Sequence, residues 1–310
     1  MVAFDMAKRA KAENWLFFID TNVLLDFYRL GGPSAERQLK ALEQHKGVII
    51  ILDQVWAEFL RNRQKVIHED AIKNLAKSPQ RNAPPIVTDY QPFKMYRKAT
   101  TESEKQLKKV RDKIEKVLRD PSKHDPVYQS LKRIFSNDSP YNLRRPDKRR
   151  FQIRSLARKR FSLGYPPRKA NDTSIGDAVN WEWIIHCAQN CPNKSHVMIV
   201  TRDQDYGIMF DGAPILNDWL KHEFSERVGT RRKVELSNKL TEAIKKMNGS
   251  VTQTDVKEEK DLIGLYKSSR SFVEQPSQLT ISPQLLRSTS DSEALRSMLA
   301  SLLKSSRSDD

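Results

Sequence analysis

The sequence predicts an α/β fold with a parallel sheet flanked by helices, and two observations lead to this prediction. Apolar runs occur at Leu16–Ile19, Val48–Leu52 and Val197–Val200, and each has the length and composition of a strand buried on both faces. Helical patterns lie between these runs, so strands and helices alternate along the chain. Such alternation is typical of a parallel sheet with helices on its faces.

Helical sequence follows each of the first two strand patterns. After Leu16–Ile19, VLLDFY begins a helix, and GGPSAERQLKALEQHKG predicts a short amphipathic helix that starts at Ser34 and stops at Gly47. The second strand, Val48–Leu52, precedes the long helical pattern DQVWAEFLRNRQKVIHEDAIKNLAK, which we expect Asp53 to cap. The order of elements up to this point is βαβα.

A mostly helical insertion is predicted from residue 85 to residue 164. PQRNAPP predicts a linker, and TESEKQLKKVRDKIEKVLRD and PVYQSLKRIF predict two helices, the first highly charged with one apolar stripe. We therefore expect residues 1–84 and 165–248 to form the two parts of one domain, separated by this basic insertion.

The α/β pattern returns after the insertion. DTSIGDAVNWEWIIHCA predicts a helix, the strand Val197–Val200 follows, and APILNDWL predicts a short fourth strand and helix. VELSNKLTEAIKKMNG predicts a closing helix that ends at Asn248 and Gly249. Residues 249–310 are rich in Ser, Thr, Lys and Glu, which predicts a mostly flexible tail.

One segment of this tail has a different pattern. SDSEALRSMLASLLKS combines capping-box spacing with an apolar stripe, which predicts an amphipathic helix near residues 291–304. A helix of this length is marginal alone in water, so we expect it to dock on a protein partner or on a second copy of the chain. Packing against the chain's own globular part is the alternative.

The composition favours an anionic partner. The chain has 310 residues, and 55 Lys and Arg against 39 Asp and Glu give a formal net charge of +16. An excess of this size is typical of proteins that bind nucleic acid or an anionic surface. Cys187 and Cys191 have no second pair to complete a zinc site. No apolar stretch approaches the length of a membrane span, so we expect a cytoplasmic protein without a membrane partner.

Carboxylates follow the predicted strands. Asp20 and Asp203 end the first and third strand patterns, while Glu58 lies one turn into the helix after the second strand and Asp177 lies in the first turn of the helix before the third. Carboxyl ends of parallel strands meet at one edge of a sheet, so several of these acids should converge there. Gathered carboxylates repel one another unless a cation neutralises them, and oxygen ligands without His or Cys favour Mg²⁺ or Mn²⁺. Helix capping is the competing explanation for Asp20 and for Asp177.

Four segments in this order resemble the PIN-domain nucleases: FIDTNVLL, QVWAEFLRNR, IGDAVNWEWII and IVTRDQDYG. The similarity covers about residues 14–80 and 165–225, and the insertion resembles those of larger bacterial PIN-like proteins. The resemblance implies a catalytic and metal-ligating set with two supporting polar groups and two further candidate ligands. The catalytic and metal-ligating residues would be Asp20, Glu58, Asp177 and Asp203. The supporting groups would be Asn22 and Thr201, and the further candidate ligands are Asp172 and Asp205.

The resemblance also implies a reaction, in which a metal-activated water hydrolyses a phosphodiester and leaves a 5′-phosphate and a 3′-hydroxyl. The expected substrate is nucleic acid, with RNA favoured over DNA, and the family serves as toxins, antiviral defence effectors and RNA-processing enzymes. A non-catalytic PIN-like nucleic-acid-binding protein is the alternative. A phosphatase of the haloacid dehalogenase type is disfavoured because Asn22 replaces its general acid, and an amide cannot transfer that proton.

A basic stretch precedes the second acidic segment. Nine Lys or Arg residues lie between positions 144 and 160, interleaved with aromatic side chains on which unpaired bases could stack. Basic runs are also common on solvated surfaces, which is the alternative explanation. The predicted nucleic-acid-binding residues are Arg144, Arg145, Arg149, Arg150, Arg154, Arg158, Lys159, Arg160 and Lys169.

Overall fold

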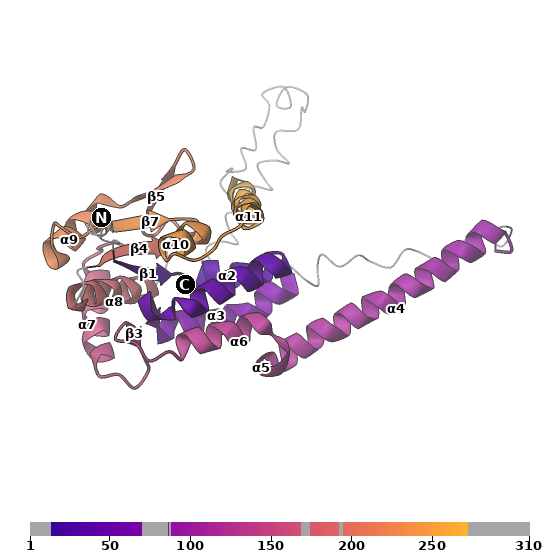
Figure 1. The fold of residues 1–310 in the computed structure, drawn as a ribbon, viewed down its shortest axis with the longest axis horizontal. Coiled ribbons are helices and arrows are strands. Elements are labelled where there is room, and N and C mark those ends of the chain that lie inside the picture. The colour runs from indigo at the N-terminus through magenta and orange to yellow at the C-terminus, as the bar shows by residue number, and fades with distance from the viewer. Residues whose placement is uncertain (1–13, 70–85, 87, 169–173, 192–194, 272–310) are drawn as a thin grey trace, which may run out of the picture. The chain divides into compact units, whose positions relative to one another are not determined.

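A five-stranded parallel sheet organises the fold in the computed structural model, which describes residues 14–69, 86, 88–168, 174–191 and 195–271 (Figure 1). The strand order is β3-β2-β1-β4-β7, and all four pairings are parallel. The predicted α/β fold with a parallel sheet is therefore confirmed. The strands are β1 Trp15–Ile19, β2 Ile49–Leu52, β3 Asn142–Leu143, β4 His196–Val200 and β7 Val234–Ser237.

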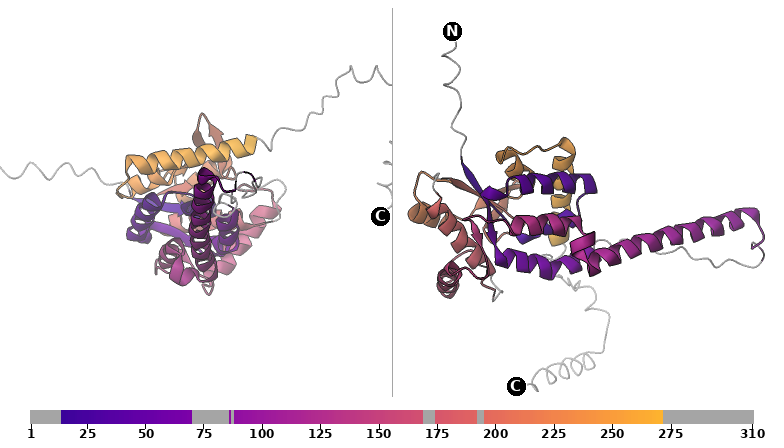
Figure 2. Two further views of the ribbon diagram at one scale, coloured as in Figure 1. Left: turned by 90° about the vertical axis from the view of Figure 1, so that its right-hand side faces the viewer. Right: turned by 60° about the horizontal axis from the view of Figure 1, so that its bottom comes forward.

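Helices cover both faces of this sheet, which explains why its central strands are apolar throughout. All residues of β1 and β2 are buried. On one side, α8 (Gly176–Asn190) packs against β2 and β4, and α7 (Arg149–Ser162) and α9 (Asp218–Val228) pack against α8. On the other side lie α2 (Gly32–Gln44), α3 (Asp53–Ile67) and α10 (Leu240–Lys246), as the views in Figures 1 and 2 show.

The insertion is mostly helical, as predicted, and it also contributes an edge strand. Its helices are α4 (Gln91–Arg119), α5 (Pro121–His124), α6 (Pro126–Phe135) and α7. Between α6 and α7 the short strand β3 pairs with β2, so the insertion extends the sheet. The boundaries at residues 84, 164 and 248 stay predictions.

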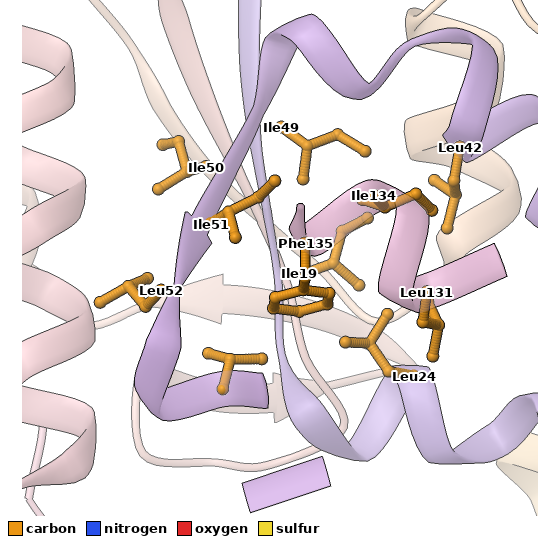
Figure 3. A pocket seen from close by; sticks show the side chains of 11 residues that line it. Ile19, Leu24, Leu42, Ile49, Ile50, Ile51, Leu52, Leu131, Ile134 and Phe135 are labelled. Atoms are coloured by element: carbon orange, nitrogen blue, oxygen red, sulfur yellow. The ribbon is translucent and has the colours of Figure 1, made fainter. Parts of the chain in front are cut away.

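The side chains of α6 complete the apolar core beside β2. Leu131, Ile134 and Phe135 face Ile49 and Ile51 of the strand, together with side chains from α1 (Thr21–Leu25) and α2 (Figure 3). The lining is entirely apolar, and the space it encloses is only about 10 Å³. A cavity of this kind belongs to the packed core and offers no polar group to a ligand.

Several predicted elements differ in the structure. VELS forms the strand β7 and only Leu240–Lys246 is helical, so the prediction of one continuous helix is wrong. The predicted fourth strand is the second arm of an antiparallel hairpin, β5 (Gly207–Phe210) with β6 (Ala213–Leu216). The helix predicted to start at Ser34 begins at Gly32, and Asp53 is the first residue of α3 rather than its cap.

The chain continues in a helix where a flexible tail was predicted. Helix α11 spans Gln253–Ser271, and Asp255 and Glu259 on it are buried. Helical structure with buried side chains therefore continues beyond Gly249, where the sequence predicted a flexible tail. The linker PQRNAPP and the amphipathic helix near 291–304, with its predicted partner or second copy, lie outside the described residues. No helix in the described part of the chain is long and apolar enough to cross a membrane.

Candidate active site

The two central strands of the sheet lead away in opposite directions. From β1 the chain moves to β2 and β3, whereas from β4 it moves to β7 on the other side. The carboxyl ends of β1 and β4 thus form a topological switch point, where a crevice for ligands opens in α/β sheets. Asp20 follows β1, and Thr201 and Asp203 follow β4. The backbone N–H of Asp20 donates to Val200 O at 2.9 Å, which holds the two strand ends together.

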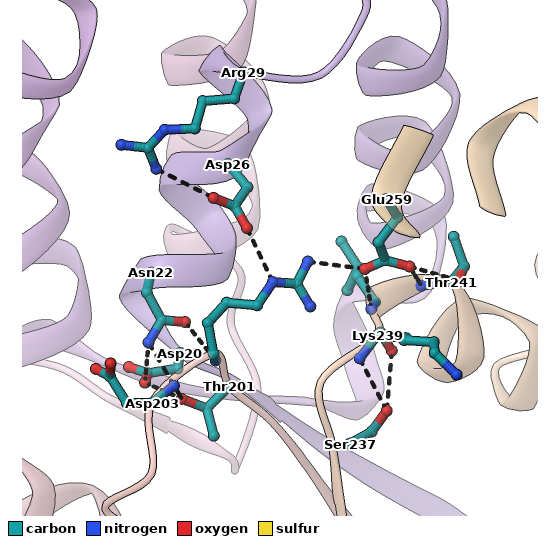
Figure 4. A network of polar contacts seen from close by, with 12 residues as sticks. Asp20, Asn22, Asp26, Arg29, Thr201, Asp203, Ser237, Lys239, Thr241 and Glu259 are labelled. Carbon is teal, nitrogen blue, oxygen red and sulfur yellow. Dashed lines mark hydrogen bonds and ion pairs between the residues drawn. The ribbon is translucent and has the colours of Figure 1, made fainter. Parts of the chain in front are cut away.

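Asp20 is a buried carboxylate, only 6% exposed, whose two oxygens are both hydrogen-bonded. Its Oδ1 accepts from the backbone N–H of Thr21 at 2.7 Å. Its Oδ2 accepts from the Thr201 hydroxyl at 2.6 Å and from Asn22 Nδ2 at 2.9 Å (Figure 4). Asn22 and Thr201, predicted as supporting groups, therefore fix the orientation of Asp20. The bond to Thr21 also makes Asp20 the cap of α1, so capping and a site role occur together.

Two further carboxylates lie close enough to Asp20 to perturb it. Thr201 Oγ1 accepts from the backbone N–H of Asp203 at 3.0 Å, and Thr21 Oγ1 donates to Glu58 Oε2 at 3.2 Å. Burial raises the pKa of Asp20 from 3.8 to about 6, and the negative charges of Asp203 and Glu58 add to this rise. Hydrogen bonds from Thr201 and Thr21 act in the opposite direction. The fold thus places two of the other three predicted acids, Asp203 and Glu58, close to the desolvated carboxyl group of Asp20.

Asp177 and Asp205 approach the same region through a buried tyrosine. Burial raises the pKa of Tyr206 well above its ordinary value of 10. The negative charges of Asp177, Asp20 and Asp205 raise this pKa further, Asp177 most, whereas the Asn180 side chain lowers it. Asn180 lies one turn after Asp177 on α8. Its Oδ1 and the Tyr206 hydroxyl are both buried, and neither makes a hydrogen bond of ordinary geometry within the described part of the chain. Asp172 lies outside the described residues.

The donor set suits a hard divalent cation. It consists of carboxylate, hydroxyl and amide oxygens, the ligands that Mg²⁺ and Mn²⁺ prefer. Burial is the main cause of the raised pKa of Asp20, and the negative charges of Asp203 and Glu58, which such a cation would neutralise, add to it. Among the described residues, no three His, Cys, Asp or Glu side chains form a group that could itself hold a metal ion. Mg²⁺ commonly uses only one or two protein carboxylates, with water and substrate phosphate as its remaining ligands.

A buried ionic network supports the loop that carries Asp203. The side chain of Arg202 is 5% exposed and lies between Asp26 and Glu259, with N···O distances of 3.0 and 2.9 Å. Its backbone N–H donates to Asn22 Oδ1 at 3.1 Å. Glu259 also accepts from the backbone N–H groups of Leu240 and Thr241 at the start of α10 (Figure 4). The loop is therefore fixed from both sides by α11 and by the segment after β1.

Sequence reasoning missed several of these residues. Arg202, Asn180 and Tyr206 are part of the segments that carry the predicted acids, but nothing in the pattern separates them from neighbouring polar residues. Glu259 lies in the segment predicted to be flexible. A signal was available for it, because Asp255, Glu259 and Leu262 are spaced as one helical face, and the structure buries all three.

The predicted nucleic-acid-binding residues divide into exposed, half-buried and buried groups. Arg160 is wrong as a member of this set, because its buried guanidinium pairs with Glu182 at 2.9 Å and with Glu223. Its position was readable, since it falls on the face that also buries Ile153 and Ala157. Lys169 lies outside the described residues. Arg144, Arg145, Arg158 and Lys159 are exposed, and Arg149, Arg150 and Arg154 are half-buried.

Two half-buried arginines already have internal partners. Arg149 pairs with Asp147 and lies 5.0 Å from the centre of the Trp183 ring, and Arg150 pairs with Asp53 at 3.0 Å.

Comparison with known proteins identifies one family. A family model described as PIN domain matches residues 17–206. This interval begins in β1 and includes Asp20, Glu58, Asp177 and Asp203, as well as the whole helical insertion. Searches of curated proteins and of solved structures gave no significant match.

Proposed function

The chain belongs to the PIN-domain family, and on that premise we propose that it is a divalent-metal-dependent nuclease that hydrolyses phosphodiester bonds. PIN domains are generally metal-dependent nucleases, and the family supports a role in acting on or binding nucleic acid. One observation supports catalysis by this chain in particular. Asp20, at the switch point of the sheet, is a buried carboxylate whose pKa is raised to about 6 beside Asp203 and Glu58. A folded protein gains no stability from such an arrangement, which is typical of functional sites.

The residues of the proposed site have two roles, which are to hold the cation and to orient the acids that hold it. Asp20, Glu58, Asp177 and Asp203 would hold Mg²⁺ or Mn²⁺, with Asp205 nearby. The bound cation would supply a water of lowered pKa and charge stabilisation on the phosphate. Thr201 orients the two strand-end acids, since its hydroxyl donates to Asp20 and accepts from the N–H of Asp203.

The substrate we propose is nucleic acid, with RNA favoured over DNA. The net charge of +16 supports an anionic substrate. Arg145, Arg158 and Lys159 are exposed on the insertion that the family model includes. A toxin or antiviral defence role is part of the proposal because the family includes such effectors.

Cleavage assays test the proposal. The full chain is incubated with a labelled RNA or DNA, linear or circular, in Mg²⁺, in Mn²⁺ and in EDTA. We expect cleavage with either cation, including cleavage of the circular substrate, products with 5′-phosphates, and none in EDTA. Asp203→Asn should lower the rate at least about 100-fold. Asp211→Asn is the matched control, because Asp211 is exposed in the hairpin turn and has φ 47°, which asparagine tolerates.

Two results would contradict the proposal. If the Asp203→Asn variant cleaved at the parent rate, the assignment of the active site would be wrong. Binding without cleavage in both cations would make the chain a non-catalytic PIN-like nucleic-acid-binding protein.

A further inference from the structure

A groove of about 700 Å³ runs along α3 between the insertion and the start of α8. Four arginines line it: Arg61 from α3, Arg145 from the segment before α7, and Arg150 and Arg154 from α7. They come from positions up to 93 residues apart in sequence, so the fold, and not one basic run, brings them together. The sequence pattern pointed to three of them and gave no indication of Arg61.

The groove has a strong excess of positive charge. Asp53 is the one carboxylate among the described residues that line it, and it pairs with Arg150. The Nε of Arg150 is buried and makes no hydrogen bond within the described part of the chain. Besides the Arg150–Asp53 pair, the groove is lined by three further arginines, Arg61, Arg145 and Arg154. Planar guanidinium groups are the side chains best suited to bind phosphate through two parallel hydrogen bonds.

The groove also has apolar lining from α3, which we call its floor. It includes Trp56 and Leu60, and Leu60 is 42% exposed. The Trp56 ring is held in place by Phe59 at 5.3 Å and by Tyr128 at 5.4 Å, measured between ring centres. A fixed aromatic and aliphatic floor among arginines suits a nucleobase whose face is free, because bases stack on such surfaces with little regard to sequence.

The groove borders the candidate active site on α3. Gln54, Glu58 and Arg61 are spaced by four and three residues, so they follow one stripe of the helix. Gln54 also contacts the start of α8, where a Cβ at Gly176 would lie 2.5 Å from its Nε2. Ser174, two residues before Gly176, completes the lining at this end. Glu58 lies between the lining residues Gln54 and Arg61 along α3, and Ser174 lies close to the helix turn that carries Asp177, so the groove adjoins the candidate active site.

We propose that this groove binds single-stranded nucleic acid next to the cleaved bond, with phosphates on Arg61, Arg145 and Arg154 and an unpaired base on Trp56 and Leu60. The identity of the ligand rests on the proposed function. A duplex does not fit the same chemistry, because its base faces are stacked and hidden from the apolar floor. The substrate class is thus a single strand or an unpaired region, of RNA or DNA.

Binding measured in EDTA tests the groove separately from cleavage. The probes are a fluorescein-labelled single-stranded 12-mer as RNA, the same sequence as DNA, and its duplex. The test variant carries Arg61→Gln, Arg145→Gln and Arg154→Gln. The matched control carries Lys221→Gln, Arg231→Gln and Lys257→Gln, which removes the same charge from exposed positions outside the groove. Both are compared with the parent from 50 to 300 mM salt.

We expect the groove variant to bind at least tenfold more weakly than the parent at low salt. Each phosphate that the variant no longer binds should lower the slope of log affinity against log salt by about 0.7, or about 2 for three phosphates. The control variant should keep a slope within about 0.7 of the parent. If the triple variant fails to fold, the pair Arg61→Gln and Arg145→Gln, both exposed, carries the same expectation with a slope change of about 1.4.

Three results would overturn the inference: equal slopes in the groove and control variants, equal affinity for duplex and single strand, or equal competition by polyglutamate of matched charge. The last would assign the groove to acidic proteins. Failure of the proposed function is distinguishable, because a chain that never cleaves would still show the groove-specific slope in EDTA. Conversely, a chain that cleaves while the groove variant binds like the parent would keep its function and lose this site.

Discussion

Replacing Asp20 by asparagine should change how the stability of the apo protein depends on pH. Burial raises the pKa of Asp20 from 3.8 to about 6, so between these pH values the folded protein holds a proton that the unfolded chain has released. Stability contributed by this group therefore falls as pH rises from about 4 to about 6 and is constant above that. Asparagine has nearly the same shape and no such titration.

The size of the effect follows from the shift. A difference of about 2.2 in pKa corresponds to about 3 kcal/mol of folding free energy lost at pH 7 through ionisation of Asp20. At pH 4.5 the same linkage leaves a loss of only about 1 kcal/mol. Asparagine has one acceptor oxygen for the three donors from Thr21, Asn22 and Thr201, which costs about 1–3 kcal/mol at every pH. The variant should thus match or exceed the parent in stability at pH 7.

Denaturant unfolding of both proteins at pH 7 and pH 4.5, in EDTA, measures this. The difference in unfolding free energy between Asp20→Asn and the parent should move by about 2 kcal/mol toward the parent on acidification. Other groups titrate in both proteins, so the difference isolates Asp20 and the neighbours coupled to it. A difference that is the same at both pH values would refute the assignment of a destabilised carboxylate. The same variant should also lose cleavage, because it lacks one anionic oxygen ligand.

Three further predictions concern the metal and the two buried ionic networks. Mg²⁺ or Mn²⁺ at ten times its dissociation constant should stabilise the parent by about 1.4 kcal/mol in thermal melts, and EDTA or Asp20→Asn should remove this gain. Arg160→Gln should cost about 3–5 kcal/mol in denaturant unfolding and leave the salt slope of binding unchanged, whereas Arg158→Gln, at an exposed position, should stay within about 0.5 kcal/mol. Glu259→Gln should cost about 2–3 kcal/mol and lower the cleavage rate, with the exposed Lys260→Gln as a near-neutral control; equal stability of these two variants would contradict a supporting role for Glu259.

The central strands and the carboxylates that follow them were predictable from sequence for a physical reason. A strand buried on both faces has to be apolar at every position, so a polar residue marks its end clearly. Asp20 and Thr201 both follow such strands, and parallel strands bring their carboxyl ends to one edge. Local pattern and topology thus point to the same place. The assignment of Glu58 relied on family resemblance, since a glutamate on a helix is ordinary without knowledge of what it faces.

Elements at the edge of the sheet could not be predicted in the same way. Strand β7 is only partly buried, and its four residues VELS run directly into a helical pattern, so periodicity does not separate them. Strand β3 has two residues and exists because β2 offers it a partner. Arg160 shows that a basic residue in the sequence cannot be assigned to the surface from local pattern alone. Its burial depends on Glu182 and Glu223, which lie 22 and 63 residues away in sequence.

The support of the candidate site extends beyond the interval that matches the family. The match ends at residue 206, yet Arg202 within it is held by Glu259 of α11. Glu259 also accepts hydrogen bonds from the backbone N–H groups of Leu240 and Thr241 at the start of α10, so one carboxylate joins the loop that carries Asp203 to two later helices. Removing that carboxylate would deprive the buried Arg202 guanidinium of an ion pair at 2.9 Å and would leave two backbone N–H groups without their acceptor. Preorganisation of Asp203 therefore depends on a segment that composition alone assigns to a tail.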